Sequence, residues 1–275
     1  MASPVTTYAA AQLIRLVPRV RLSRAVGKLC EQPLPPAVSR VATQLYARAY
    51  AVQLDEAENE AQPYRSFDEF FTRRLRPGSR PIEASPFVSP SDGCIVAAGD
   101  VAASSDIVVK GRPYGVSDLC GSVEARARYA QGEFAVIYLH PRDYHRVHSP
   151  VDGAITLVRG MPGDLYPVNA IGERHVPGLF VRNQRVAFEI ETESLGLVTV
   201  VMVGATIVGR ISAAVLGNDR TPMGEHPLNP PASVARGDEI GVFHLGSTVV
   251  VLLQTSGRLS RATGPVRYGE SLVRA

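Results

Sequence analysis

Gly246 and Ser247 interrupt an apolar run near the end of the chain. The run reads Ile-Gly-Val-Phe-His over residues 240–244 and Val-Val-Val-Leu-Leu over residues 249–253. By itself such a break is typical of a turn at a strand edge. It also has a chemical use, because a serine hydroxyl can attack a carbonyl, including that of the preceding peptide. The Gly-x-Ser-x-Gly elbow of α/β-hydrolases is missing, which favours attack on the chain's own backbone over attack on an external ester.

Three of the six histidines lie within nine residues, at His140, His145 and His148. A lone histidine is more often structural, and this density indicates function. A zinc site is an alternative, but the spacing matches no common zinc pattern and no nearby Cys or Glu completes one. We therefore expect no metal.

Asp92 lies in the segment Ser89–Gly93, where Asp-Gly alone favours a plain turn. Asp92, His148 and Ser247 are the residue types of a charge-relay triad, although composition alone is weak support. Small residues at both ends of 204–209 indicate either close backbone approach or ordinary strand-end packing.

The chain has 275 residues, enough for one large domain or one domain with appendages. Its net charge of +3 gives no argument for nucleic acid. Three cysteines without a close pair fit a reducing compartment and argue against a disulfide framework. With only Lys28 and Lys110, lysine Schiff-base chemistry has two candidates.

Residues 11–30 combine apolar positions such as Leu13, Leu16 and Val20 with five basic residues and no acid. This pattern is typical of a helix that lies on an anionic membrane surface. A helix packed on the domain by its apolar side and an Arg-rich transit peptide are alternatives. Pro18 is expected to break the segment in two. No stretch has the ~20 apolar residues of a membrane span.

The chain divides into a helical part, residues 1–82, and a β-rich part, residues 83–275. Residues 38–50 have helical spacing, and Ser66 to Glu69 has that of a capping box. Prolines over 217–238 predict a long surface loop. The fold class is thus mostly β, an antiparallel sandwich or barrel-like core with an N-terminal α-helical, membrane-docking region. The predicted strands are 107–109, 134–139, 154–158, 186–190, 197–203, 206–211, 240–243 and 248–253.

Over several segments that include the histidines and the Leu-Gly-Ser-Thr sequence, the chain resembles the phosphatidylserine decarboxylases of the bacterial, membrane-associated type. Ser91 is a departure, since the family usually has alanine there. The matching segments occur in family order over nearly the whole chain: Ser66–Arg76 with Arg80-Pro81-Ile82, Ser89–Gly93, Pro141–Ser149, Met161–Asn169, Val203–Gly209 and Leu245–Thr248.

The resemblance implies a proenzyme that cuts itself at Gly246, giving a β chain, 1–246, and an α chain, 247–275. Asp92, His148 and Ser247 would form the charge relay, with Asp92 holding the imidazole. Ser247 would become a covalent pyruvoyl cofactor, which forms a Schiff base with the amine of phosphatidylserine. Loss of CO2 would then yield phosphatidylethanolamine.

The resemblance further implies that His145 acts in decarboxylation, by positioning the carboxylate or supplying a proton. Tyr138 is expected to line the substrate pocket. The partners would be phosphatidylserine, an anionic membrane surface and the other chain of an αβ heterodimer, which can dimerise further, but no nucleic acid. The expected location is the cytoplasmic side of the cell membrane, peripherally attached. The rival functions are a lipid-ester hydrolase, a non-catalytic membrane-binding β module and a pyruvoyl decarboxylase acting on a free amino acid.

Overall fold

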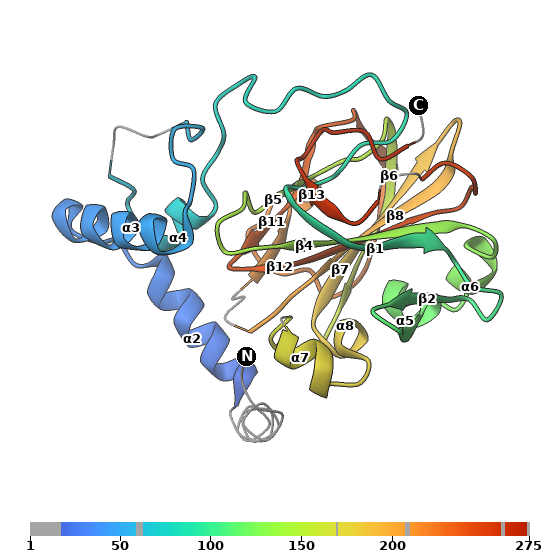
Figure 1. Cartoon of the computed structure of the whole chain (residues 1–275), viewed down its shortest axis with the longest axis horizontal. Coiled ribbons are helices and arrows are strands. Elements are labelled where there is room, and N and C mark those ends of the chain that lie inside the picture. Colours follow the sequence, from blue (N-terminus) through green and yellow to red (C-terminus); the bar gives the residue numbers. More distant parts are fainter. Residues whose placement is uncertain (1–17, 59–62, 169, 207–209, 260–261, 274–275) are drawn as a thin grey trace.

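A computed structural model describes residues 18–58, 63–168, 170–206, 210–259 and 262–273 (Figure 1). The fold is mostly β, as predicted, with helices at the N-terminus and short helices between strands. The helices are α2 (Arg19–Glu31), α3 (Pro36–Tyr50), α4 (Phe67–Phe71), α5 (Val116–Cys120), α6 (Ala125–Arg128), α7 (Ala170–His175), α8 (Leu179–Arg182) and the 3-10 turn η1 (Ala214–Leu216). The strands are β1 (Gly93–Asp100), β2 (Asp106–Val109), β3 (Arg112–Gly115), β4 (Glu133–Leu139), β5 (Arg146–His148), β6 (Gly153–Met161), β7 (Arg185–Thr192), β8 (Gly196–Val203), β9 (Arg210–Ala213), β10 (Gly224–Val234), β11 (Glu239–His244), β12 (Ser247–Leu253) and β13 (Gly264–Val266).

The core is built on an eight-stranded antiparallel sheet of order β10-β6-β7-β8-β12-β4-β1-β13. Strand β12 lies in its interior, paired with β4 on one side and β8 on the other. Every side chain over Val249–Leu253 is completely buried. A continuous β-branched and leucine run is what a strand covered on both faces requires, which explains why this strand was predictable.

A second sheet, of order β5-β11-β9, continues three neighbouring strands of the first. Strands β4, β12 and β8 are neighbours in the large sheet. The strands that adjoin them in the sequence, β5 after β4, β11 before β12 and β9 after β8, are neighbours in the small sheet. The three strands are therefore interrupted together: β4 ends at Leu139, β11 at His244 and β8 at Val203, and the next strands begin at Arg146, Ser247 and Arg210. Segments far apart in the sequence meet along this break (Figure 1).

The prediction of a loop over 217–238 is wrong, because β10 occupies Gly224–Val234. It pairs with β6 at the edge of the large sheet, with a register break between Pro227 and Ala232. An edge strand tolerates prolines, since the missing N–H groups can face away from the ladder. The strand predicted over 206–211 is displaced: Thr206 is in a turn, 207–209 lie outside the described residues, and β9 begins at Arg210.

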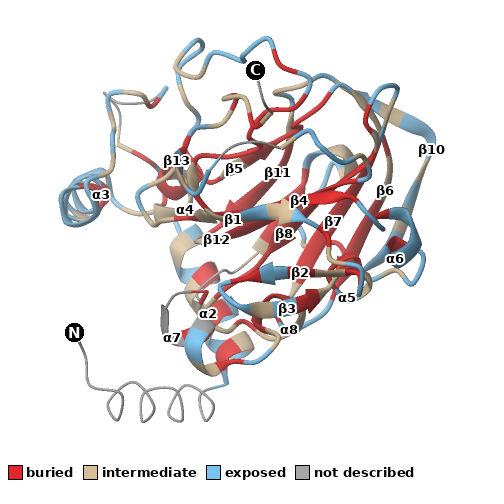
Figure 2. Cartoon of the chain, turned by 45° about the vertical axis from the view of Figure 1, so that its right-hand side comes forward, coloured by how far each residue is buried: buried red, intermediate tan, exposed pale blue. Residues whose placement is uncertain are grey.

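The N-terminal helices turn their apolar side chains outward. In α2, which begins directly after Pro18, the buried residues are Arg19, Ser23 and Gly27. In α3 they are Ser39, Thr43 and Ala47. The alternative that residues 11–30 pack by their apolar side is thus wrong for α2, and in both helices small or polar residues four apart make the contact instead (Figure 2). Leu13 and Leu16 lie outside the described residues. No described helix is long and apolar enough to cross a membrane.

Helix α4 begins as the capping-box pattern predicts. The Ser66 hydroxyl accepts a hydrogen bond from the Glu69 backbone N–H at 3.1 Å. In return the Glu69 carboxylate accepts a hydrogen bond from the backbone N–H of Arg65, one residue earlier than in the standard motif. Phe70 and Phe71 are buried, so this five-residue helix is fixed by its cap and its aromatic side chains.

Candidate active site

The Gly246–Ser247 peptide lies at the break between the two sheets. Its upstream neighbour Leu245 has φ +85° and Gly246 has φ +32°. The left-handed region costs a non-glycine residue about 1–3 kcal/mol, so the surrounding structure must hold Leu245 there. A Cβ on Gly246 would meet no atom within 4 Å, so its backbone conformation, and not lack of space, favours glycine. Ser247 is the first residue of β12, opposite Leu139.

His148, on β5, is held in one tautomer by a backbone carbonyl. Its Nδ1 lies 2.8 Å from the Gly237 oxygen, which can only accept, so Nδ1 carries the proton. Nε2 then presents its lone pair, 3.1 Å from the Tyr144 hydroxyl. Burial lowers the pKa of His148, which keeps the ring neutral and able to accept a proton.

Among the described residues Asp92 makes no hydrogen bond or ion pair with His148, the contact that the predicted relay needs. Its carboxylate accepts from Arg80 at 2.7 and 3.1 Å and from the Tyr268 backbone N–H at 2.9 Å. The Tyr268 ring in turn stacks on the His148 ring, with centroids 3.9 Å apart. Asp92 therefore reaches His148 indirectly, through Tyr268, while Gly237 takes the orienting role expected of the carboxylate.

The glycine after Asp92 is required by a close backbone approach. Gly93 has φ +154°, and a Cβ there would lie 2.5 Å from the Tyr138 carbonyl oxygen. Gly93 thus allows β1 to pack closely against β4. The prediction of a plain turn at Asp92-Gly93 was incomplete. Pro90, in the same segment, accepts a hydrogen bond from the His148 backbone N–H at 2.8 Å.

His145 is fully buried, and neither ring nitrogen makes a hydrogen bond of normal geometry. Its ring packs on Phe71 with centroids 4.0 Å apart. Burial, aided by the positive charge of Arg73, lowers the pKa of His145 to about 3, so the imidazole is neutral. Its carbonyl accepts from the Phe243 N–H at 3.0 Å, which places the residue beside the end of β11. Buried polar groups without partners are rare and call for a functional explanation.

Tyr138 lies one residue along β4 from the partner of Ser247. It is opposite Thr248 on one side and Cys94 on the other. Its half-buried ring meets the edge of His140 at 4.8 Å between centroids. Thr248 is 1% exposed and its hydroxyl has no partner among the described residues, a second unsatisfied polar group beside Ser247.

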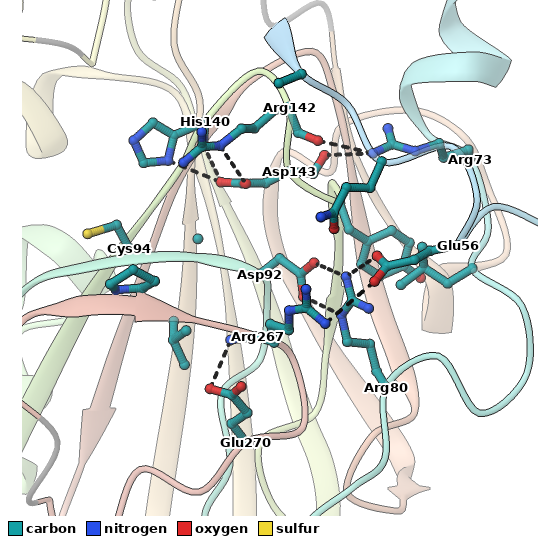
Figure 3. A pocket seen from close by; sticks show the side chains of 17 residues that line it. Glu56, Arg73, Arg80, Asp92, Cys94, His140, Arg142, Asp143, Arg267 and Glu270 are labelled. Atoms are coloured by element: carbon teal, nitrogen blue, oxygen red, sulfur yellow. Dashed lines mark hydrogen bonds and ion pairs between the residues drawn. The ribbon is translucent and has the colours of Figure 1, made fainter. Parts of the chain in front are cut away.

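A polar cavity of about 670 Å³ opens next to these residues (Figure 3). Tyr144, which contacts His148, and Asp92, which contacts Tyr268, both line it. His145 is not among its lining residues. Acidic and basic side chains alternate around it, namely Glu56, Asp92, Asp143 and Glu270 with Arg73, Arg80, Arg142 and Arg267.

Several residues of the site carried no readable sequence signal. Gly237 acts through its carbonyl, which any residue type has. Tyr144 and Tyr268 approach His148 from the histidine segment and from the C-terminal segment. Phe71 has a signal in retrospect, since it belongs to the Ser66–Arg76 segment that the family resemblance rests on.

The fold and the site define a β-rich protein with a strained Gly-Ser junction among buried histidines, and comparison with known proteins supplies its family. Residues 67–274 match the phosphatidylserine decarboxylase family model. A phosphatidylserine decarboxylase proenzyme of Brevibacillus brevis is 42% identical over 95% of this chain and 94% of its own length. Proenzymes of the same name from Anaeromyxobacter sp. and Acinetobacter baylyi are each 40% identical, over 94% and 87% of this chain and 95% and 84% of their own lengths. The chain belongs to the phosphatidylserine decarboxylase family and is an enzyme of that family.

Proposed function

We propose that this chain is a self-processing decarboxylase that converts phosphatidylserine to phosphatidylethanolamine and CO2. One observation supports it most: three neighbouring strands break together, which brings Gly246–Ser247 beside the segment 140–148 that carries the histidines. The family relation supplies the substrate, and the printed name of the relatives, proenzyme, agrees with a precursor that is cut.

Cleavage would begin when the Ser247 oxygen attacks the Gly246 carbonyl, giving up its proton and converting the amide to an ester. Removal of the Ser247 α-proton then expels Gly246 as a carboxylate and leaves a dehydroalanine. This tautomerises, and addition of water releases ammonia and leaves a pyruvoyl group on residue 247. The left-handed backbone at Leu245 and Gly246 favours this reaction, because breaking the peptide bond relieves the strain.

His148 is the base best suited to take the Ser247 proton. It is neutral because burial lowers its pKa, and the Gly237 carbonyl leaves Nε2 free of hydrogen. In this structure the Tyr144 hydroxyl donates a hydrogen bond to the Nε2 lone pair, so this hydroxyl must move aside before Ser247 can transfer its proton to Nε2.

The pyruvoyl group would supply a carbonyl that takes the substrate amine as a Schiff base and withdraws electrons as CO2 leaves. The residues around position 247 fit such a group. His145 and Thr248 both hold buried polar atoms without partners, which a bound substrate can satisfy. We assign His145 the positioning of the substrate carboxylate or the return of a proton to the carbanion, and Tyr138 a place in the pocket wall.

The polar cavity is the candidate site of the charged headgroup. Arg142 and Arg267 are half exposed, and their ion pairs are long, at 3.8 Å to Asp143 and 3.5 Å to Glu56. Such loosely paired guanidinium groups can exchange a carboxylate partner for a phosphate. Arg80 is instead held by Glu56 and Asp92, each at 2.7 Å. We therefore assign phosphate binding to Arg142 and Arg267.

A peripheral position on the cytoplasmic side of the cell membrane completes the proposal. Exposed apolar side chains on α2 and α3 support it, together with basic residues on the same helices. Leu22, Leu29, Val38, Val41 and Leu45 are 46–70% exposed. Apolar insertion and attraction to anionic lipids both strengthen such binding. The cut protein is a heterodimer of 1–246 and 247–275, and dimerisation of that heterodimer would also cover these side chains.

Intact mass of the purified protein tests the proposal. Two fragments, 1–246 and 247–275, are expected, the second without a free amino terminus. Ser247→Ala should remain one chain, whereas Ser256→Ala, at a turn serine after β12, should be cut. A lipid-ester hydrolase would instead remain uncut and be labelled by a phosphonate at Ser247. An uncut wild-type chain with full decarboxylase activity would contradict the proposal.

A further inference from the structure

A second charged cluster lies on the upstream side of the cleavage site. His244, the last residue of β11, is 8% exposed. Its Nδ1 lies 2.9 Å from both carboxylate oxygens of Asp68 on α4. Its Nε2 lies 3.3 Å from the Ser212 hydroxyl on β9. Neither Asp68 nor His244 has a part in the chemistry proposed above.

The cluster ties the end of β11 to two N-terminal helices. The Asp68 carboxylate can only accept, so His244 donates its Nδ1 proton to Asp68, and the Arg210 Nη2 lies beside this bond, 3.0 Å from the same Nδ1. Arg210 lies 3.7 Å from Asp68 and 3.5 Å from Glu31, the last residue of α2. Arg210 is also the backbone partner of His244 in the β9–β11 ladder. One residue of β11 is thus connected to α4 directly and to α2 through Arg210.

The location of the cluster is significant because only Leu245 and Gly246 separate it from Ser247. A strained backbone persists only where both of its ends are fixed. Downstream, β12 is fixed by ladders on both sides. Upstream, β11 belongs to the small sheet and ends at His244, so its last side chain determines where the strained segment begins.

We propose that the Asp68–His244 pair is a positioning element for self-cleavage, which holds the upstream end of the Leu245–Gly246 segment so that the Gly246 carbonyl faces Ser247. The proposal rests on the self-cleavage proposed above. It gives α4 two functions, since Asp68 holds the cleavage strand and Phe71 packs on His145. Correct seating of α4 is then a condition for maturation.

Cleavage kinetics of pulse-labelled protein test this inference. Asp68→Ala and His244→Leu should each be cut roughly tenfold more slowly than wild type, as expected for a misplaced reacting group. The double variant should be no slower than the slower single variant, because both changes remove one interaction. His244→Lys restores a partner for Asp68 and should be cut at nearly the wild-type rate. Glu225→Gln removes a carboxylate from a distant pair with Arg159 and is the matched control.

The outcomes separate the two proposals. A wild-type chain that stays uncut contradicts the proposed function itself. Wild-type rates in both single variants, with wild type cut, overturn only the positioning proposal. So does a double variant slowed by the product of the two single effects, since the side chains then act independently. If Asp68→Ala loses its cooperative unfolding transition, the positioning proposal is tested by His244→Lys and His244→Leu instead. Faster cleavage of His244→Lys supports it, and equal rates overturn it.

Discussion

His148 donates its Nδ1 proton to the carbonyl oxygen of Gly237 at 2.8 Å. Gly237 lies in the turn that leads into β11, and β11 ends beside the cleavage site. One continuous segment therefore orients the candidate base and leads to the peptide that is cut. A carbonyl fixes a tautomer as well as a carboxylate does, without adding a charge. With burial lowering its pKa, His148 combines a free Nε2 with neutrality at physiological pH.

Removal of this base should stop maturation. We expect His148→Ala to remain a single chain in intact-mass spectra, because the variant lacks the Nε2 lone pair that the Gly237 carbonyl leaves free of hydrogen. His226→Ala changes a partly exposed histidine on the edge strand β10 and should be cut as wild type is. Fragments in the His148→Ala protein at the wild-type rate would show that another group takes the proton.

Asp92 should matter less than His148. In Asp92→Asn the ion pair with Arg80 is lost, which loosens Tyr268 and its stacking on His148. We expect slower but complete cleavage, followed by the time course of fragment formation. A chain as fully uncut as His148→Ala would mean that Asp92 turns toward the imidazole during the reaction, as the family resemblance implies.

His145 should be needed after cleavage, not for it. His145→Ala is expected to give both fragments yet decarboxylate roughly a hundredfold more slowly or worse, the usual contribution of a positioned acid or base. Fragment analysis and CO2 release from phosphatidylserine vesicles, measured on one sample, separate the two steps. An uncut variant, or one with unchanged CO2 release, contradicts this division of roles.

Stability should fall in acid because of the buried histidine His145. Its native pKa of about 3 lies below the ordinary 6.5, so below pH 6.5 the unfolded chain binds a proton that the native chain does not. At pH 5.5 this costs about 1.4 kcal/mol relative to pH 7.5 or above. Urea unfolding at both pH values should show a smaller loss for His145→Phe than for wild type. Equal losses would contradict the assignment.

Membrane binding should depend on the exposed leucines of α2 and α3. Leu29→Gln and Leu45→Gln, at positions 70% and 61% exposed, should each weaken binding to anionic vesicles roughly tenfold, from the loss of apolar burial. Val123→Gln, at a position 81% exposed on the catalytic part, is the matched control. Unchanged vesicle binding together with a change in oligomeric state would instead show that a second copy covers these helices.

The sequence predicted those elements whose environment one residue pattern determines. The strand 248–253 was evident because a buried strand needs an unbroken β-branched run, and α4 because its cap is local. The strand β10 was missed because its prolines look like a loop unless the edge position is known. The outward apolar face of α2 is what a membrane-surface helix over residues 11–30 requires, whereas no face was predicted for α3, because periodicity gives a stripe but not the side that meets the protein.

The same distinction applies to the site. Ser247, His145 and His148 were singled out because their residue types and family order are specific, and their roles stay predictions. The contact of His148 with Gly237 was not predicted, since the two residues are 89 positions apart and the acceptor is backbone. The ion pair of Asp92 with Arg80 was not predictable for a similar reason, since only the folded chain brings the two residues together.

The position of β12 also determines how the cut enzyme would behave over time. The fragment 247–275 would contribute β12 to the interior of the large sheet and β13 to its edge, with β4 and β1 of the other fragment enclosed between them. To leave, it must break the ladders on both sides of β12 and expose five wholly buried side chains. Exchange of the fragment between molecules would then proceed only as fast as global unfolding, so a mixture of isotope-labelled and unlabelled enzyme should keep its parental pairings for as long as it stays native.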